Sequence, residues 1–354
     1  MKNMLIIKDM KDWFWSTYPN WERSVSLDVA KLADYFTRHD FQVEVTSYKT
    51  FDFNRNYQDY YVLYGSAEDL CGGTKDYIED IVLWLQDKGA YLMPSFKYFR
   101  AHENKVMMEL LRKDFRNEKL KTIQTRPYSS LEALGDNEQE FPVVVKTAAG
   151  SGSEGVALAR NYEELVKQAE RFSRLADGKR YHYLSLVNMK QNLIGQPHVP
   201  IHNSKFIVQT FIPNLTGDYK ILVFGDHYFI LRRRNRDGDF RASGSGKFSF
   251  DIPENEREGL LEFARTCKSE IFSPHLSIDV CYDGKTYHLI EFQCLSFGFK
   301  AMSMSERHYV PDGAGWKCIE GKINPEDEFC YAVTYFLNGQ KFGKAGSCTQ
   351  ANCI

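Results

Sequence analysis

The sequence predicts a protein of the α/β or α+β class, with a mainly parallel, helix-covered sheet near its N-terminus. Short apolar runs and helical patterns alternate over the first hundred residues. This alternation is typical of βαβ units, in which helices cover a parallel sheet. The chain has 354 residues, too many for one small domain, so we expect two or three domains.

In this first region, strands are expected where apolar residues run together or alternate, at 4–7, 41–45, 60–64 and 90–93. Helices are expected where apolar residues recur every three or four positions, at 25–36 and 78–85. Gly89 follows the second helix, where glycine commonly ends a helix, and Pro94 stops the last strand.

Beyond residue 100 the patterns become more mixed. Helical spacing predicts helices at 103–112, 162–172, 255–270 and 326–336. Apolar or alternating runs predict strands at 141–146, 156–159, 206–211, 219–224, 227–231 and, as a hairpin, 276–292. Gly225-Asp226 and Asp283-Gly284 have the composition of hairpin turns. The polar segment 173–204 shows no periodicity and is expected to be irregular.

Composition limits the function. Apolar residues make up 43% of the chain and charged residues 26%, which excludes a disordered protein. The net charge of −2 gives no electrostatic reason to expect nucleic acid or a membrane as the partner. We find neither a membrane span nor a secretory signal, and the eight cysteines form no C-x-x-C pair, so a cytoplasmic protein with reduced thiols is expected.

A glycine-rich hairpin is the first candidate site. The strand that ends in Lys146 is followed by the run 147–155, rich in glycine and serine, and by a second strand. Glycine lets backbone N–H groups approach a phosphate closely, and the Lys146 ammonium would reach the same phosphate. Because the run opens no helix, it is neither a P-loop nor a Rossmann motif. The alternative is an ordinary mobile turn.

Two acidic residues form the second candidate site. Asp279 and Glu291 lie on the two strands of one hairpin, so strand register can bring their carboxylates together. Gln293, two residues after Glu291, projects from the same sheet face. Two carboxylates and an amide oxygen suit Mg²⁺, or Mn²⁺ in its place. The alternative, a solvated acid pair, is disfavoured by the apolar neighbours at 289–292.

The third candidate is the segment 231–247, which holds six basic and two acidic residues. A local positive charge in a nearly neutral chain suggests a small anionic ligand or a developing phosphate charge. A solvated basic loop is the alternative.

In this order the three segments resemble the ATP-grasp superfamily, in particular its RimK-like carboxylate–amine ligase branch, over about residues 95–300. The helix beginning near Lys105 looks like the lysine-bearing helix of the family. The segment 208–213 is similar to the hinge that holds adenine. The segments 217–225 and 239–244 match the strand and loop that carry the family's aspartate and arginines.

The resemblance implies an ATP-grasp fold preceded by an N-terminal βαβ domain. It implies four regions: a pre-ATP-grasp domain, a central subdomain with the phosphate flap, a C-terminal subdomain with the magnesium site, and a terminal helix and tail, at 1–104, 105–204, 205–320 and 321–354.

The resemblance also implies site residues. The nucleotide-binding set is Lys105, Lys146, Gly150, Ser151, Gly152, Ser153, Gly155, Gln209, Thr210, Phe211, Ile212 and Asp218. The metal ligands are Asp279, Glu291 and Gln293. Arg241 is expected to stabilise the transferred phosphoryl group, and Arg232 or Arg234 to orient a substrate carboxylate. Lys220 stands where the family has arginine, and Gln293 where it has asparagine.

The implied reaction is ATP- and Mg²⁺-dependent ligation of a carboxylic acid to an amine through an acyl-phosphate, with release of ADP and phosphate. The expected partners are a small acid and a small amine, for example an amino acid or a peptide, and a second copy of the chain in a homodimer. Two alternatives remain: a small-molecule kinase of the same fold, and a non-catalytic ATP-binding module.

Overall fold

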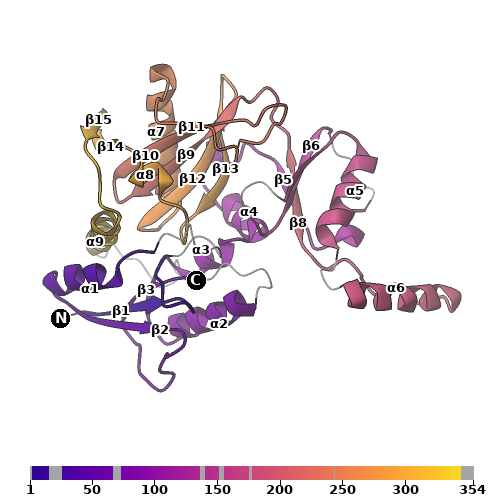
Figure 1. Cartoon of the computed structure of the whole chain (residues 1–354), viewed down its shortest axis with the longest axis horizontal. Helices are drawn as coiled ribbons and strands as arrows, with labels where there is room; N and C mark the ends of the chain where they lie inside the picture. The colour runs from indigo at the N-terminus through magenta and orange to yellow at the C-terminus, as the bar shows by residue number, and fades with distance from the viewer. Residues whose placement is uncertain are drawn as a thin grey trace.

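Three β-sheets organise the part of the chain that the structure describes (Figure 1). The structure is a computed structural model that describes residues 2–15, 26–66, 73–135, 140–150, 155–174, 178–242 and 244–343. For residues 340–343 it describes only the backbone. None of the described helices is both long and apolar enough to cross a membrane.

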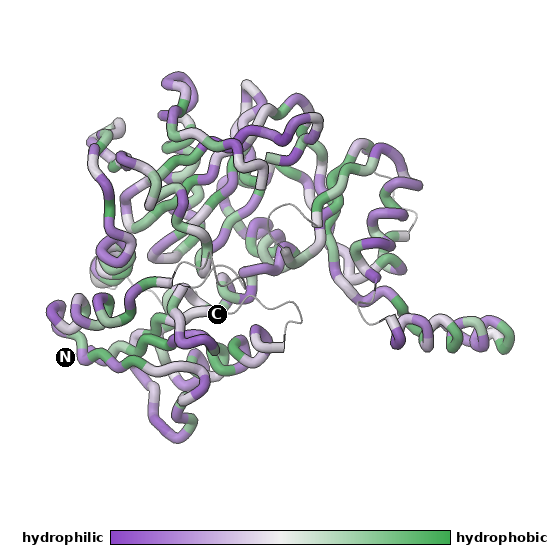
Figure 2. The backbone as a smooth tube through the Cα atoms, viewed as in Figure 1, coloured by the Kyte–Doolittle hydropathy of each residue, from purple (hydrophilic) through white to green (hydrophobic). Residues whose placement is uncertain are grey.

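The N-terminal sheet is entirely parallel, which confirms the class predicted from the alternation of patterns. Its region contains β1 (Lys2–Lys8), α1 (Val29–Arg38), β2 (Phe41–Ser47), β3 (Tyr61–Tyr64), α2 (Gly73–Asp87) and β4 (Tyr91–Met93). The strand order is β2-β1-β3-β4. Met4 to Ile7 are completely buried, which explains the unbroken apolar run of β1 (Figure 2). Gly89, with φ of 84°, follows α2 as expected.

The central sheet is antiparallel and carries the glycine-rich hairpin. Its region contains β5 (Thr125–Tyr128), β6 (Val143–Thr147), β7 (Val156–Ala159), α5 (Tyr162–Ser173) and β8 (Phe206–Thr210). The order is β5-β8-β6-β7, and β6 pairs with β7 with Lys146 opposite Val156. Because β8 belongs to this sheet, we propose that the boundary expected at 204 lies after β8 instead.

The third sheet is the largest, with the order β13-β12-β9-β10-β14-β15 and the short β11 paired to β10. Its region contains β9 (Gly217–Phe224), β10 (His227–Arg234), β11 (Phe248–Ser249), α7 (Glu254–Glu270), β12 (His275–Tyr282), β13 (Tyr287–Gln293), α8 (Lys300–Ser303), β14 (Arg307–Asp312) and β15 (Gly315–Glu320). Both predicted hairpin turns are confirmed, because β9 pairs with β10 and β12 with β13. β14 and β15 were not expected.

The two faces of the third sheet have different neighbours. On one face, Ile221 and Val223 share a core with Leu260 and Ala264 of α7. On the other, Leu222 and Phe224 join the core of the N-terminal sheet, together with α9 (Pro325–Gly343). The N-terminal sheet therefore packs against one face of the third sheet. Along β9, Asp218 and Lys220 lie on this same face, at the end of the strand away from Phe224.

Short helices join the three sheets. They are α3 (Phe96–Ala101), α4 (Lys105–Lys113), η1 (Glu118–Leu120) and η2 (Leu131–Ala133). Asn104 begins α4 by accepting a hydrogen bond from the backbone of Met107 at 3.3 Å. α4 contacts β13 of the third sheet and both β5 and β8 of the central sheet, so it links them.

The expectation of irregular structure at 173–204 is wrong for residues 178–193, whereas 194–204 contain no helix or strand. The segment contains α6 (Gly178–Leu193), which extends away from the rest of the molecule in Figure 1. No residue of α6 is buried, and Tyr183, Leu186 and Met189 are more than half exposed. Because the helix covers no core, its sequence lacks the buried stripe on which the periodicity argument depends.

Candidate active site

Strand register gathers polar side chains on one face of the third sheet. Asp218 on β9 lies opposite Arg233 on β10. Lys220 on β9 lies opposite Asp279 on β12, which in turn lies opposite Glu291 on β13. Directly opposed residues of antiparallel strands project to the same face, so these five side chains form one cluster. The predicted juxtaposition of Asp279 and Glu291 is confirmed.

Salt bridges neutralise the middle of this cluster. The Arg233 guanidinium donates to both carboxylate oxygens of Asp218, at 2.6 and 2.8 Å, and lies 2.8 Å from Asp279. The Lys220 ammonium lies 3.3 Å from the other oxygen of Asp279. Burial raises the pKa of Asp279, but Arg233 and Lys220 lower that pKa more, so Asp279 is ionised. Burial raises the pKa of Asp218 despite its arginine partner.

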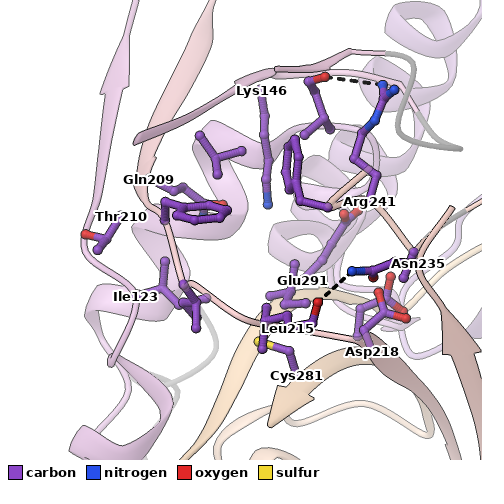
Figure 3. A pocket seen from close by; sticks show the side chains of 18 of the residues that line it. Ile123, Lys146, Gln209, Thr210, Leu215, Asp218, Asn235, Arg241, Cys281 and Glu291 are labelled. Carbon is purple, nitrogen blue, oxygen red and sulfur yellow. Dashed lines mark hydrogen bonds between the residues drawn. The ribbon is translucent and has the colours of Figure 1, made fainter. Parts of the chain in front are cut away.

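Two lysines approach this cluster from the central region. Lys146 on β6 and Glu291 line the same cavity, into which Figure 3 shows the Lys146 side chain extending. Burial lowers the pKa of Lys146, and the Glu291 carboxylate partly opposes that shift. Lys105, at the start of α4, donates to the carbonyl of Gly150 at 2.9 Å. Gly150 has φ of 109°, a conformation that favours glycine.

The cavity that these lysines line, here called the first cavity, has a volume of about 200 Å³. Its apolar walls come from both subdomains: Ile123, Val144, Phe211, Leu215, Phe240, Cys281 and Ile290. Polar groups lie at one side, where Asn235 donates to the carbonyl of Leu215 at 2.6 Å (Figure 3). Arg241 lies at another side and pairs with Asp239. An apolar slot with cationic groups at one end suits a planar base that carries phosphates.

A second cavity, of about 300 Å³, adjoins the first. Both cavities are lined by Gly150, Ala242, Asp279 and Glu291, so the metal-ligand candidates stand at their junction. The basic residues that line the second cavity are Lys220, Arg233, Lys247 and Lys300. Its apolar wall is made by Leu231, Phe248 and Phe297.

Most residues expected from the sequence line these two cavities. The first is lined by Lys105, Lys146, Gly150, Gly155, Gln209, Thr210, Phe211, Ile212, Asp218, Arg241, Asp279 and Glu291. The second adds Lys220 and Gln293. Ser151, Gly152 and Ser153 lie outside the described residues.

Arg232 and Arg234 line neither cavity. Side chains alternate along β10, so these two arginines project to the face opposite Arg233, where Arg232 lies 5.9 Å from the ring of Tyr219. The sequence reasoning missed Arg233, Lys247, Lys300 and Ser296. The signal that could have found Arg233 was the Gly225-Asp226 turn, because that turn fixes Asp218 opposite Arg233.

A buried polar network behind the first cavity was also missed. Arg112 of α4 lies 3.3 Å from the carboxylate of Glu109 and donates to the carbonyl of Ile290 at 3.0 Å. Gln209 of β8 donates to Glu109 at 3.1 Å. The network therefore connects two elements that line the cavity, β8 and β13, through α4.

The residues at the junction fit one divalent cation. Among the described residues no three His, Cys, Asp or Glu side chains form a metal site by themselves. Asp279 and Glu291 nevertheless oppose each other directly, and Gln293 lies beside them, donating to Glu291 at 3.1 Å. Mg²⁺ in nucleotide sites is commonly held by one or two carboxylates, with phosphate and water oxygens completing its shell. This oxygen donor set matches that requirement.

Comparisons with known proteins identify the fold and the family. No curated protein matches the sequence. Among solved structures, the fold is similar to a D-cycloserine synthetase, with 12% identity, coverage of 95% of this chain and 99% of the other, and a TM-score of 0.51. It is also similar to the ADP complex of an N5-carboxyaminoimidazole ribonucleotide synthetase, with 11% identity, coverage of 86% of this chain and 73% of the other, and a TM-score of 0.51. A third similar structure is D-alanine–D-alanine ligase from Bacillus anthracis, with 11% identity, coverage of 98% of this chain and 100% of the other, and a TM-score of 0.47.

The family comparison is more specific. The model of the RimK-like ATP-grasp domain matches residues 102–307, which is more than half of the chain and includes all the residues that line the two cavities. The match confirms the resemblance that the glycine hairpin, the acidic pair and the basic segment indicated. This chain belongs to the RimK-like ATP-grasp family, whose fold is that of the ATP-grasp ligases.

Proposed function

We propose that the protein is an ATP-dependent carboxylate–amine ligase that forms an amide through an acyl-phosphate. One observation carries the proposal: Lys105 and Lys146 on one side, and Asp279 and Glu291 on the other, line a single cavity that adjoins a second, basic one. A nucleotide in the first cavity would direct its phosphates toward the acid in the second.

The first cavity supplies what ATP binding needs. The apolar slot takes the base, and the segment from Gln209 to Ile212, which lines the slot, lies along the edge of the base. Lys105 and Lys146 neutralise the phosphate chain, and the glycines at 150 and 155 allow its close approach. The assignment of Asp218 to nucleotide binding is less direct, because its carboxylate is held by Arg233.

Asp279, Glu291 and Gln293 would hold Mg²⁺ or Mn²⁺, which supplies charge neutralisation at the β- and γ-phosphates. Asp279 would then divide its charge between the ion and two side-chain cations, Lys220 and Arg233. We therefore assign to Arg233 and Lys220 the orientation of the substrate carboxylate, in place of Arg232 or Arg234. Arg241 stabilises the transferred phosphoryl group.

The proposed chemistry has two steps. A carboxylate oxygen of the acid attacks the γ-phosphorus, the bond from that phosphorus to the bridging oxygen breaks, and ADP leaves with the electron pair. The amine nitrogen then attacks the acyl carbon, the carbon–oxygen bond to phosphate breaks, and the nitrogen loses a proton to give the amide. No protein nucleophile is required, so the residues act by positioning and charge stabilisation.

Hydroxylamine tests the reaction directly. A pool of carboxylic acids is incubated with ATP, Mg²⁺ and hydroxylamine, and both ADP and hydroxamate are measured. A ligase gives ADP and hydroxamate in equal amounts, because hydroxylamine captures an acyl-phosphate. A kinase of a hydroxyl group gives ADP without hydroxamate, and a binding module gives neither.

Two variants assign the residues. Glu291→Gln should abolish ADP formation while the protein remains folded by circular dichroism. Glu306→Gln is the matched control, because Glu306 is exposed and its one ion pair with a described residue is to Lys322. Arg241→Ala should retain ATP binding in calorimetry and lose ADP formation by about 100-fold or more. Full activity of the Glu291 variant would contradict the metal assignment. The cytoplasmic location and the homodimer stay predictions.

A further inference from the structure

The second cavity contains an exposed cation, Lys300, that no carboxylate of the described residues neutralises. Three of its four basic side chains are paired: Lys220 and Arg233 with Asp279, and Lys247 with Asp237 at 2.6 Å. For Lys300 the described residues provide no ion pair and no hydrogen bond. The Lys300 ammonium lies instead 4.8 Å from the ring centre of Phe248.

A buried hydroxyl in the same cavity also lacks a partner. Ser296 lines the second cavity and is only 3% exposed, and its Oγ makes no hydrogen bond with any described residue. Burying a hydroxyl without a hydrogen-bond partner destabilises the folded protein. Ser296 also has a backbone φ of 47°, which is uncommon for a residue other than glycine. Both features are typical of a residue held in place for a ligand.

The loop that carries Ser296 is fixed from outside the cavity. The indole of Trp15, which is 1% exposed, donates to the carbonyl of Phe297 at 3.0 Å. The same indole packs against the rings of Phe297 and Phe299, with ring centres 5.3 and 5.8 Å apart. Because the N-terminal region holds this loop, Ser296 is preorganised toward the cavity wall.

The charges lining the second cavity favour an anion. Its described lining has four basic side chains and three carboxylates, Glu103, Asp279 and Glu291. Because Asp237, outside the lining, balances Lys247, these charges cancel until a divalent ion joins Asp279 and Glu291 and makes the cavity positive. A single reacting carboxylate at the junction leaves Lys300 still without a counter-charge.

We propose that the acid substrate carries a second anionic group, which Lys300 and Ser296 bind in the part of the second cavity that the first cavity does not share. This inference rests on the proposed ligase function and adds the substrate class, a dicarboxylic acid or an acid with an equivalent second anion. The reacting carboxylate lies at the junction beside Glu291. The carbon chain between the two groups lies against Phe248, Phe297 and Leu231.

Matched substrates test this inference. The probes are the dicarboxylic acids succinate, glutarate, adipate, aspartate and glutamate, each beside its monoamide of nearly equal shape, with hydroxylamine as the amine. At least one dianion is expected to give kcat/KM about tenfold or more above its monoamide, because a hydrogen bond to a charged group is worth about that factor.

Variants connect the preference to the residues. Lys300→Met should lower kcat/KM for the dianion by about 10- to 100-fold and leave that for the monoamide and the KM for ATP unchanged. Lys300→Arg should retain the preference, and Ser296→Ala should weaken it by about 2- to 10-fold. Lys322→Met is the control, because Lys322 is 77% exposed and lines neither cavity.

The possible failures are distinguishable. Equal turnover of dianions and monoamides, or turnover of monocarboxylic acids alone, overturns the second-anion inference and leaves the ligase proposal intact. A dianion preference that survives Lys300→Met overturns the assignment to Lys300. ADP formation from none of a broad pool of acids overturns both proposals together.

Discussion

The buried pair of Glu109 and Arg112 should couple the stability of the fold to the nucleotide cavity. Both side chains are at most 3% exposed, and α4 holds them between β8 and β13. Replacing Arg112 with Met keeps much of its volume but removes its charge and its hydrogen bond to the carbonyl of Ile290. The Glu109 carboxylate then stays buried without its nearest cation.

The expected magnitude follows from these contacts. Removing one partner of a buried ion pair costs about 3–5 kcal/mol, mainly because the other charge is left uncompensated. Lys146 remains near Glu109 and partly compensates its charge, so Arg112→Met should cost about 3 kcal/mol. Glu109→Gln should cost a similar amount. The double variant removes both charges and should cost about 2 kcal/mol less than the sum of the two.

Urea unfolding measures this coupling. Far-ultraviolet circular dichroism and tryptophan fluorescence are recorded together, because coincident transitions are needed before a free energy of unfolding is assigned. Arg116→Met is the control: Arg116 is 87% exposed, so its loss should change the free energy by no more than about 0.5 kcal/mol. Additivity of the two core substitutions within about 0.5 kcal/mol would show that the pair does not act as a unit.

Three further outcomes are expected. Trp15→Phe removes the indole hydrogen bond to the substrate loop, so steady-state kinetics should show a KM for the acid raised about 2- to 10-fold and an unchanged KM for ATP. Arg233→Met should reduce ADP formation by about 100-fold, whereas Arg232→Met should not, and equal effects would contradict the strand-face assignment. Backbone N–H groups hold the pKa of Asp283 at about 2. This pKa is below the value near 4 that Asp283 has in the unfolded chain, so the stabilisation from Asp283 is lost as the pH falls from about 4 to 2. The Asp283→Asn variant should therefore lack this part of the fall in Tm at acid pH.

Features set by local chemistry could be predicted from the sequence. The Asp283-Gly284 turn places Asp279 and Glu291 on the two strands of one hairpin, and it therefore predicted that they lie near each other; their direct pairing also depends on a bulge between Asp279 and Val280. Lys146 could be placed beside the glycine run because both belong to one short hairpin. In each case a turn of known composition joins the two parts, so no long-range information is needed.

Features set by distant packing could not be predicted in the same way. α6 buries no residue, so no apolar periodicity marks it. The loop with Ser296 becomes part of a cavity wall because Trp15, more than 280 positions earlier in the chain, holds it. The sequence pattern of the helix predicts that Arg112 is exposed, whereas in the structure it contacts β13 and is buried. Each of these depends on a contact between segments that no local pattern connects.

Arg233 lies between these two cases, because the information was present in the sequence but needed two steps. The Gly225-Asp226 turn pairs Phe224 with His227, and counting outward along both strands places Arg233 opposite Asp218. Opposed residues share a face, so the partner of a carboxylate in the site must be Arg233, whereas its two neighbours must face α7. A run of three arginines therefore contains one site residue, and the strand register, rather than the local charge, identifies it. The same counting applies to a hairpin without a bulge, where it converts a basic run into a specific residue to substitute; in the β12–β13 hairpin a bulge between Asp279 and Val280 shifts the count by one residue.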